Sequence, residues 1–409
     1  MSAQSQRKPR RRAELPWKKR VLFSGIYVLF MAFSLWCFGE FFLRVISLHF
    51  VSFKSAPFRQ YDADVGISLI PNVKVIHERG CFKGEVVVNR WGMRDRDRSL
   101  EKSPGGFRIA LLGDSAIEGV HVRPDEVVNI RMEKILKNKG YNKVEVLNFG
   151  VEGIGTTQEF LIYEQRARRF HPNLVVLVYS DNDVMNNSST LQPKAYGIHT
   201  WYCPYFDLGP DGNLVFRPVE PRPFNRIRSF LEPHSVVVYY MERMWTRVNL
   251  PLYRYTWHGI PVMWGGYGDP PDAEWARAWL VTERVMALLR RTVLEDGAEL
   301  AVMSWPGFYR IDPDWRRRFT KQVGRIPPDF KPVSMEVRLK EIADRNHITL
   351  DFLYPYLQAY RDAHKLQWPY FSFTCDPHYS ALGHQVVAEA IVQKLEEHHL
   401  LPEPADGPK

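Results

Sequence analysis

The sequence has little of what marks several common kinds of functional site. Only four of its 409 residues are cysteine, and no CxxC or HExxH spacing occurs, so we expect no metal site. Gly150, Gly153 and Gly155 do not have the GxGxxG spacing, which argues against a nucleotide-binding loop. Apolar residues at 45% and charged residues at 25% exclude a disordered, collagen-like or coiled-coil chain. The sequence therefore predicts a packed protein that needs neither a metal nor a cofactor.

Net charge is scarce outside the N-terminus. The whole chain has a formal charge of +9, but residues 1–20 carry eight basic side chains and one acidic side chain, a net of +7, which leaves +2 for the rest. A strongly basic body would favour nucleic acid as a partner. A nearly neutral body gives no basis for one, and we expect no nucleic-acid partner.

The sequence contains only one long hydrophobic run. Residues 21–39 carry no charge, and at about 1.5 Å per residue they span nearly the whole ~30 Å hydrocarbon core of a bilayer. We predict one transmembrane signal-anchor helix over residues 21–46, in contact with membrane lipid. The alternative is a cleaved signal peptide, which has a shorter apolar core and a small-residue cleavage site, whereas bulky Phe, Leu and Trp fill this segment.

The basic tail sets the expected orientation. By the positive-inside rule, residues 1–20 lie in the cytoplasm and the chain after about residue 48 lies outside, in the periplasm or the extracellular space. A disulfide can persist there. Cys81, Cys203 and Cys375 allow at most one internal bridge, and the sequence leaves the pair open.

Apolar runs and amphipathic segments alternate along the exported part. Buried strands are predicted over Phe107–Leu112, Val144–Phe149, Asn173–Tyr179, Glu299–Ser304 and Ile348–Leu353. Helices are predicted over residues 125–139, 156–170, 272–295, 335–346 and 381–398. Thr156 with Glu159 is expected to cap the second helix, and Asp272 the third. The alternation predicts an α/β fold with a mostly parallel five-stranded sheet between two layers of helices.

Two stretches lie outside this alternation. Residues 50–106 form an expected N-terminal extension that contains the turn-rich segment NRWGMRDRD at 89–97. Residues 186–271 are expected to be an insertion, with a hairpin turn at residues 210–212, into a domain that spans 107–398. The insertion is either a wall of the substrate site or an ordinary structural cap. Residues 399–409 are a short C-terminal tail.

Polar side chains follow the predicted strands, where the functional groups of a parallel sheet gather. Ser115 follows the first strand, residues 148–153 follow the second, and Asn182 follows the third. The loop before the last helix carries Asp376 and His378. These residues are therefore expected to lie at one edge of the sheet.

These side chains are the types that nucleophilic catalysis needs. A serine attacks only when a base takes its proton, an acid orients that base and donors stabilise the oxyanion. We predict Ser115 as the nucleophile, His378 as the base and Asp376 as the orienting acid. The N–H groups of Ser115 and Gly153 and the side-chain amide of Asn182 are the predicted oxyanion hole.

The motifs in their order resemble a known family. GDSAIEG (113–119), NFGVEG (148–153), SDND (180–183) and DPH (376–378) resemble the four blocks of the SGNH, or GDSL, hydrolase superfamily. Ser180 stands where the family's third block usually has glycine, and one residue rather than two separates the acid from the base. The resemblance implies a flavodoxin-like three-layer sandwich, the same assignment of the site residues and an acyl-serine intermediate without a cofactor. The segment 89–97 resembles what precedes the first block in bacterial membrane-anchored members.

Three functions are compatible with these residues. The leading prediction is a membrane-anchored extracytoplasmic serine esterase that cleaves O-acyl esters, with an O-acetylated glycan as substrate and with Trp201, Trp257 and Trp264 as candidates to stack on sugar rings. An O-acyltransferase that passes the acyl group to a polysaccharide is the first alternative, and a non-catalytic binding module is the second. Structural rather than catalytic roles are expected for Asp114, Asp183, Ser304 and His384.

Overall fold

The computed structural model describes residues 16–50, 58–196, 203–219, 231, 235–238, 240, 241, 244, 257–269 and 271–404, with the backbone alone at 46–50 and 79. The chain divides into two compact units. One comprises Met1–Phe53 with Phe230–Glu242, and the other comprises Lys54–Ser229 with Arg243–Lys409.

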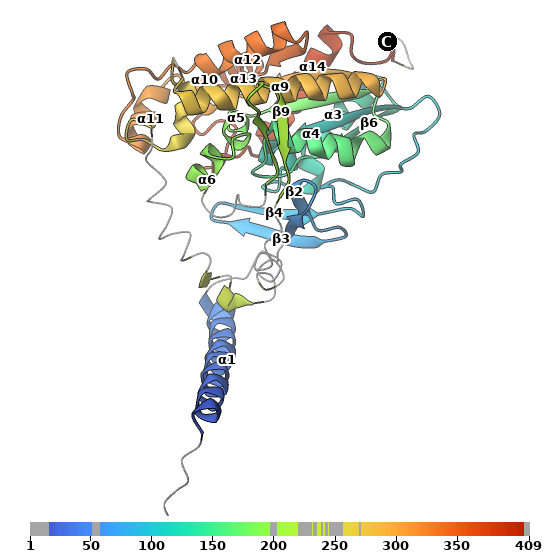
Figure 1. Cartoon of the computed structure of the whole chain (residues 1–409). Coiled ribbons are helices and arrows are strands. Elements are labelled where there is room, and N and C mark those ends of the chain that lie inside the picture. Colours follow the sequence, from blue (N-terminus) through green and yellow to red (C-terminus); the bar gives the residue numbers. More distant parts are fainter. Residues whose placement is uncertain are drawn as a thin grey trace, which may run out of the picture. The chain divides into compact units, whose positions relative to one another are not determined.

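The first unit is built on one long helix, α1 (Trp17–Phe50, Figure 1). Its segment Trp17–Val45 is long and apolar enough to cross a membrane, and its apolar side chains are exposed. The helix extends the predicted segment 21–46 at both ends. The uncharged run is therefore part of a longer helix that begins within the basic tail and includes its last four residues, 17–20.

The second unit contains a five-stranded parallel sheet in the order β11-β10-β7-β5-β6. This order places the first strand of the sheet between the second and third, which is the flavodoxin-like arrangement. The predicted α/β fold is therefore confirmed. The strands are β5 (Phe107–Gly113), β6 (Val144–Asn148), β7 (Leu174–Tyr179), β10 (Glu299–Ser304) and β11 (Thr349–Phe352).

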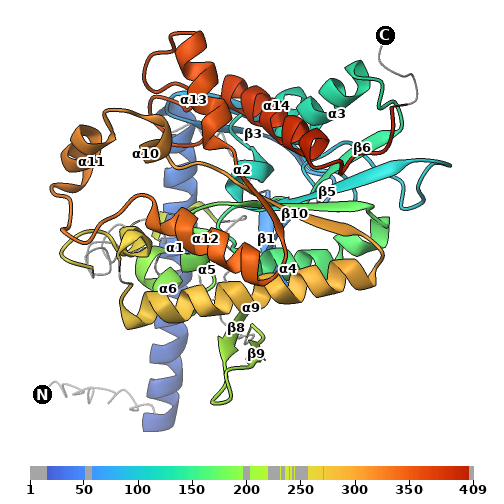
Figure 2. The same ribbon diagram turned by 90° about the horizontal axis from the view of Figure 1, so that it is seen from above.

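Helices cover both faces of the sheet, as Figure 2 shows. Val175 and Leu177 of β7 belong to a core shared with α4 (Thr156–Gln165), α9 (Ala273–Glu295) and α12 (Ser334–Arg345). Val176 and Val178 point the other way, into a core shared with α3 (Val128–Asn138), α13 (Tyr354–Ala363) and α14 (Ala381–Glu397). Successive residues of a strand face opposite sides, so an all-apolar strand needs both layers.

The helix starts agree with the sequence at α9 and differ at α4. Asp272 caps α9 as predicted, since its carboxylate accepts the N–H of Trp275 at 2.9 Å. At α4 the prediction of a Thr156–Glu159 capping box is wrong. Gln158 accepts the N–H of Gly155 at 2.9 Å instead, and Glu159 is fully buried inside the unit. The chain enters α4 one residue earlier than the Thr-x-x-Glu pattern suggests.

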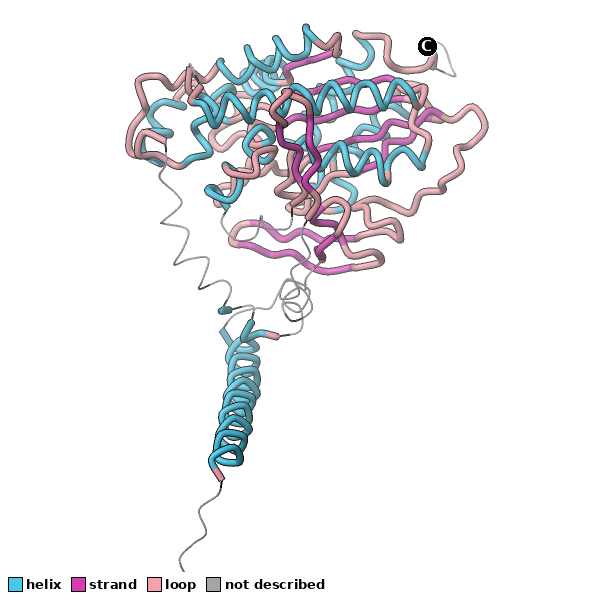
Figure 3. Tube along the Cα trace, viewed as in Figure 1, coloured by secondary structure: helices cyan, strands magenta, loops and turns pink. Residues whose placement is uncertain are grey.

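The remaining strands form antiparallel hairpins, drawn in magenta in Figure 3. The N-terminal extension contains β1 (Arg59–Asp62) with β2 (Gly66–Leu69), and β3 (Lys74–Arg79) with β4 (Phe82–Val87). The insertion contains β8 (Tyr205–Leu208) and β9 (Leu214–Arg217), joined by the predicted turn at 210–212. The shorter helices are α2 (Ser115–Glu118), η1 (Pro124–Glu126), η2 (Ala167–Phe170), α5 (Asp183–Asn186), α6 (Leu191–Tyr196), η4 (Val262–Tyr267), α10 (Phe308–Ile311) and α11 (Trp315–Val323).

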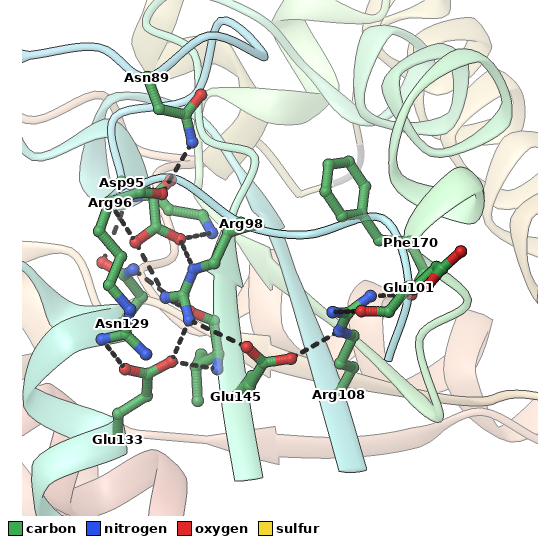
Figure 4. A network of polar contacts seen from close by, with 12 residues as sticks. Asn89, Asp95, Arg96, Arg98, Glu101, Arg108, Asn129, Glu133, Glu145 and Phe170 are labelled. Atoms are coloured by element: carbon green, nitrogen blue, oxygen red, sulfur yellow. Dashed lines mark hydrogen bonds and ion pairs between the residues drawn. The ribbon is translucent and has the colours of Figure 1, made fainter. Parts of the chain in front are cut away.

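A buried arginine joins the extension to the sheet (Figure 4). Arg98 is 2% exposed and donates to both oxygens of Asp95, to Glu133 of α3 and to the carbonyl of Val146 in β6. Burial raises the pKa of Asp95 to about 6, although Arg98 opposes the shift. Because the bonds to Glu133 and Val146 cross to other elements, the chain just after 89–97 is held onto α3 and β6.

Candidate active site

The first block forms a tight turn that exposes a serine at a helix start. The carboxylate of Asp114 accepts the N–H of Ala116 at 2.9 Å and so caps α2, whose first residue is Ser115. A Cβ at Gly113 would lie 2.5 Å from Ile117, so only glycine fits under the turn. Gly119 ends α2 in the left-handed conformation at φ +61°. The sequence GDSAIEG thus places the hydroxyl of Ser115 at the carboxyl end of β5.

The second block packs against α2. A Cβ at Gly150 would lie 2.3 Å from the backbone nitrogen of Glu118, which is why glycine stands there. Asn148 donates to the carbonyl of Ile117 at 2.8 Å and accepts the N–H of Gly150 at 2.9 Å. These contacts hold the loop after β6 beside the turn that carries the serine.

Ser115, His378 and Asp376 form one hydrogen-bonded chain. The hydroxyl of Ser115 lies 2.9 Å from Nε2 of His378, and Nδ1 of the same ring lies 2.5 Å from Oδ1 of Asp376. That oxygen also accepts the backbone N–H of His378 at 3.0 Å. One carboxylate oxygen therefore holds both the loop and the ring, which is how an acid and a base two positions apart can pair.

The pairing changes the acidity of both groups. Burial alone would lower the pKa of His378, but the hydrogen bond and charge of Asp376 outweigh it and raise that pKa above the ordinary value. Burial would raise the pKa of Asp376, but the hydrogen bonds from His378 lower it well below its usual range. Near neutral pH the carboxylate is charged and orients the imidazole with Nδ1–H toward Asp376, leaving Nε2 to accept from Ser115.

The raised pKa of His378 predicts the pH dependence of any reaction that uses it as a base. The neutral ring is the active form, so activity is lost as the pH falls through the folded-state pKa. We expect kcat/KM for p-nitrophenyl acetate to rise with pH and to reach half its maximum above pH 6.5, the ordinary value for histidine. In Asp376→Asn the midpoint should move to lower pH. A wild-type midpoint below 6.5 would contradict this assignment of the base.

The third block brings Asn182 to the same place. Its side-chain amide donates to Oδ2 of Asp114 at 2.9 Å, and the hydroxyl of Ser180 lies 3.1 Å from Oδ1. An amide nitrogen carries two hydrogens, so one remains for another acceptor. Ser180, Asn182 and Ser115 all line one cavity. Asp114 thus joins the first and third blocks, the kind of structural role expected for it.

Gly153 is placed differently from the other predicted site residues. It has φ +79°, a conformation that favours glycine, and its carbonyl accepts from the side chain of Gln192 at 2.9 Å. It does not line the cavity, and within the described residues no hydrogen bond joins it to Ser115 or Asn182. Its role in an oxyanion hole stays a prediction.

No motif in the sequence pointed to His121, which lies against His378. Its ring stacks on His378 with centroids 3.9 Å apart and planes at 15°. It is 5% exposed, and burial followed by the nearby His378 lowers its pKa to about 3, so it is neutral. Donor atoms of His121, Asp376 and His378 lie within 4.8 Å of one another, so these three residues have the types and proximity to hold a metal ion. In the structure, two of them are already paired with each other.

Two carboxyl groups lie buried close to the site. Glu159 and Asp183 are fully buried, and burial raises the pKa of each well above its usual range, with their mutual repulsion adding to that of Asp183. Asp183 accepts the N–H of Ser180 at 2.8 Å, consistent with the structural role expected for it. Both oxygens of Glu159 lack a partner among the described residues. Its burial could not be predicted, because a Thr-x-x-Glu pattern normally places glutamate at an exposed helix start.

A disulfide anchors the loop that carries the acid and the base. Cys81, at the turn between β3 and β4, is bonded to Cys375, which directly precedes Asp376. The backbone N–H of each cysteine also donates to the sulfur of the other, at 3.0 and 3.1 Å. Of the cysteines left open by the sequence, Cys203 is therefore the unpaired one, and it is buried. The N-terminal extension is thus covalently linked to the loop that carries Asp376 and His378.

A cavity of about 270 Å³ opens beside Ser115. Its described lining contains no lysine or arginine, and its acidic residues are Asp114 and Asp181. Oδ2 of Asp181 accepts hydroxyl hydrogens from Tyr267 of η4, at 2.7 Å, and from Tyr309 of α10. Nine of the lining residues are aromatic: Trp264, Tyr267, Trp305, Phe308, Tyr309, Trp368, Tyr370, Phe371 and Tyr379.

The other residues singled out from the sequence have clear positions. His384 is 2% exposed in the first turn of α14, and burial lowers its pKa to about 3. Ser304 is buried at the end of β10. Of the tryptophans proposed to meet sugar rings, Trp264 lines the cavity, Trp257 is 6% exposed in the core, and Trp201 lies outside the described residues.

Comparison with known proteins gives distant structural likenesses. No protein-family model and no curated protein matches the sequence. A lipase/acylhydrolase from Enterococcus faecalis is 13% identical with a TM-score of 0.38, over 74% of this chain and 100% of the other. An acetyl xylan esterase is 13% identical with a TM-score of 0.37, over 70% and 98%. A GDSL-like lipase from Bacteroides thetaiotaomicron is 13% identical with a TM-score of 0.32, over 71% and 88%.

Proposed function

We propose that this chain is a serine ester hydrolase of the SGNH type. The observation that carries the proposal is the hydrogen-bonded chain from Ser115 through His378 to Asp376, beside a cavity that opens onto the serine. Such a chain activates a hydroxyl that is otherwise a weak nucleophile. The direct test is hydrolysis of p-nitrophenyl acetate by the purified full chain. A protein that binds acetylated ligands but releases no product would favour the binding-module alternative.

The reaction follows from the geometry. Nε2 of His378 takes the proton of Ser115 as Oγ bonds to the carbonyl carbon of the ester. The imidazolium then gives that proton to the departing alcohol oxygen as the ester C–O bond breaks, leaving an acyl-serine. Water attacks the acyl-serine by the same route, with His378 again accepting and returning one proton. Asp376 stabilises the imidazolium formed in each half.

The developing oxyanion needs donors on the cavity side of Ser115. The free hydrogen of the Asn182 amide and the N–H of Ser115, at the start of α2, are the donors that we propose. Asp114 fixes the amide by accepting its other hydrogen. Gly153, at the end of the second block, completes the proposed set.

The cavity favours an uncharged ester with ring faces, and we propose an O-acetylated glycan. An anionic substrate would gain little counter-charge, since the described lining holds no lysine or arginine, and Arg318, whose guanidinium lies 4.1 Å from the ring centre of Trp368, is paired with Asp312. Aromatic walls offer flat apolar surfaces to the C–H faces of sugar rings, and Asp181 can accept from sugar hydroxyls. Trp368 is the best placed of them for an extended ligand, because it is 43% exposed and lines the cavity.

Replacing Trp368 tests the glycan proposal. Losing one aromatic platform of about 0.5–1.5 kcal/mol should raise KM for an acetylated glycan up to about tenfold, with little change for p-nitrophenyl acetate, which is too small to need it. Phe216→Ala is the matched control, since Phe216 is 44% exposed but lies outside the cavity lining. Equal effects of Trp368→Ala on both substrates would contradict a glycan subsite at this wall.

O-acyl transfer is the alternative outcome of the same acyl-serine. A sugar hydroxyl would replace water in the second half, and an exposed aromatic such as Trp368 could hold it. Measuring free acetate and acetylated product with and without added glycan acceptor separates the two. Hydrolysis predicts that free acetate accounts for all the ester consumed. Transfer predicts that acetylated acceptor forms and that the yield of free acetate falls by the same amount.

We further propose that α1 anchors the enzyme in the cytoplasmic membrane with the catalytic unit outside. The length and apolar surface of α1 support a spanning role, and the bridge between Cys81 and Cys375 suits an oxidising compartment. A topology reporter fused after Lys409 should be active only in its extracytoplasmic form. Cytoplasmic activity would overturn the orientation.

A further inference from the structure

A second segment of the chain packs against the C-terminal part of α1. Oε1 of Glu40 accepts the N–H of Val236 at 2.9 Å, and Oε2 accepts the hydroxyl of Ser235 at 2.9 Å and the N–H of Val237 at 3.2 Å. The indole N–H of Trp36 donates to the same serine hydroxyl at 3.1 Å. Residues 235–238, 240 and 241, called the docked segment below, belong to the same compact unit as α1 (Figure 1).

These contacts satisfy the groups that a helix start leaves open. Residues 236–238 are helical, and the first N–H groups of a helix have no acceptor within it. Glu40 accepts two of them, and Ser235 accepts the third, from Val238, at 3.2 Å. Backbone groups without partners are costly next to lipid. The first N–H groups of the docked segment have acceptors, so no unpaired backbone donor there opposes its placement at the edge of a bilayer.

The surface around this contact is apolar. Val237 packs on Gly39, where an added Cβ would lie 3.3 Å from a valine methyl group. Met241 is 66% exposed, and none of the residues of the docked segment carries a charge. On α1, three phenylalanines at the same level are 51–70% exposed: Phe38, Phe41 and Phe42. Phenylalanine is one of the apolar side chains that interfacial segments bury at the headgroup boundary of a bilayer.

We infer that the docked segment lies in the outer membrane interface and is a second membrane contact of the chain, held there by Glu40. Its depth follows from α1, because Glu40 directly follows the uncharged run 21–39 and so lies at the end of the hydrocarbon core. The inference rests on the proposed spanning role of α1 and is independent of the ester hydrolase chemistry. The occupant of the apolar surface is the bilayer, since the surface continues that of the spanning helix.

Lipid quenching of a fluorescent label tests the depth. The full chain, with Cys37→Ser and Cys203→Ser, is placed in vesicles of phosphatidylethanolamine and phosphatidylglycerol and labelled with NBD at Met241→Cys. We expect lipids with a doxyl group at carbon 5 to quench this label at least threefold more than a label at Asp211→Cys, in the exposed turn of the β8–β9 hairpin. A label at Val28→Cys, inside the span, should be quenched best by 12-doxyl lipid.

Substitution of Glu40 tests what holds the segment. Glu40→Ala should reduce quenching at position 241 at least twofold and leave position 28 unchanged, whereas Arg44→Ala, which removes the ion pair of Glu40 but keeps its carboxylate, should change neither. If the label at position 241 is no more quenched than the label at position 211, while the label at position 28 is quenched, the inference about the docked segment is overturned but the anchoring by α1 is not. An unquenched position 28 would overturn the proposed anchoring with it. Shielding of 241 that depends on protein concentration and not on doxyl lipid would assign the surface to a second copy and also overturn it.

Discussion

Replacing Ser115 with alanine is expected to remove nearly all hydrolysis of p-nitrophenyl acetate, with kcat falling about 10⁴–10⁶-fold. The reason is that, among the described residues, Ser115 is the hydroxyl hydrogen-bonded to Nε2 of the proposed base. His378→Ala should cost about as much, since Ser115 loses the acceptor that lies 2.9 Å from its oxygen. Because the two residues act as a unit, the double variant should be no worse than either single one.

The acid is expected to contribute less than the serine and the base. Asp376→Asn keeps the shape of the side chain but loses the charge that orients His378, and kcat should fall about 10²–10⁴-fold.

Ser304→Ala is the control for Ser115→Ala, because Ser304 is a buried serine at the end of another strand of the same sheet. Steady-state rates with circular dichroism to confirm folding give the comparison. Additive losses in the double Ser115→Ala/His378→Ala variant would contradict a shared mechanism.

Removing the bridge between Cys81 and Cys375 is expected to affect stability and rate together. A cross-link of this kind is worth about 2–4 kcal/mol of unfolding free energy. Since Cys375 directly precedes Asp376, the loop that holds the acid and the base should also loosen, and a misplacement of about 1 Å can lower kcat by ~10²-fold. The double Cys81→Ser/Cys375→Ser variant, measured by denaturant unfolding and by p-nitrophenyl acetate turnover, should show both losses.

The control for the bridge is the buried thiol of the same unit. Cys203→Ser changes an unpaired cysteine and leaves the bridge intact, so its kcat should stay within about twofold of wild type. Reduction should lower the activity of this variant as much as it lowers that of the wild type. Treatment of the wild type with dithiothreitol should reproduce the double variant. A double variant with lower stability but unaltered kcat would show that the loop keeps its geometry without the bridge.

The residues of the site that the sequence predicted are those whose signal is local. Ser115 stands in a Gly-Asp-Ser turn directly after an apolar strand, and Asn182 follows another, so the parallel sheet brings both to one edge. Alternating strands and helices predicted the fold class for the same reason. The capping of α4 shows the limit, because Thr156 and Glu159 fit a local pattern that tertiary packing overrode.

What the sequence could not predict depends on contacts between distant segments. His121 lies in a loop without any motif, and it meets His378 only because the loop after α2 packs against the loop before α14. Asp181 is paired with Tyr267 and Tyr309, which follow it by 86 and 128 residues. The three cysteines that follow α1 permitted several pairings, and only the fold places Cys81 beside Cys375. Such contacts leave no periodic trace in the sequence.

Covalent labelling of the full chain tests the central claim most directly. A fluorophosphonate probe reacts with a serine only when a neighbouring base activates it, and mass spectrometry of the digested protein locates the adduct. We predict one adduct, on the peptide that contains Ser115, absent in Ser115→Ala and strongly reduced in His378→Ala. A folded wild-type chain that forms no adduct, or that forms it on another serine, would contradict the proposal that Ser115, His378 and Asp376 form the active site.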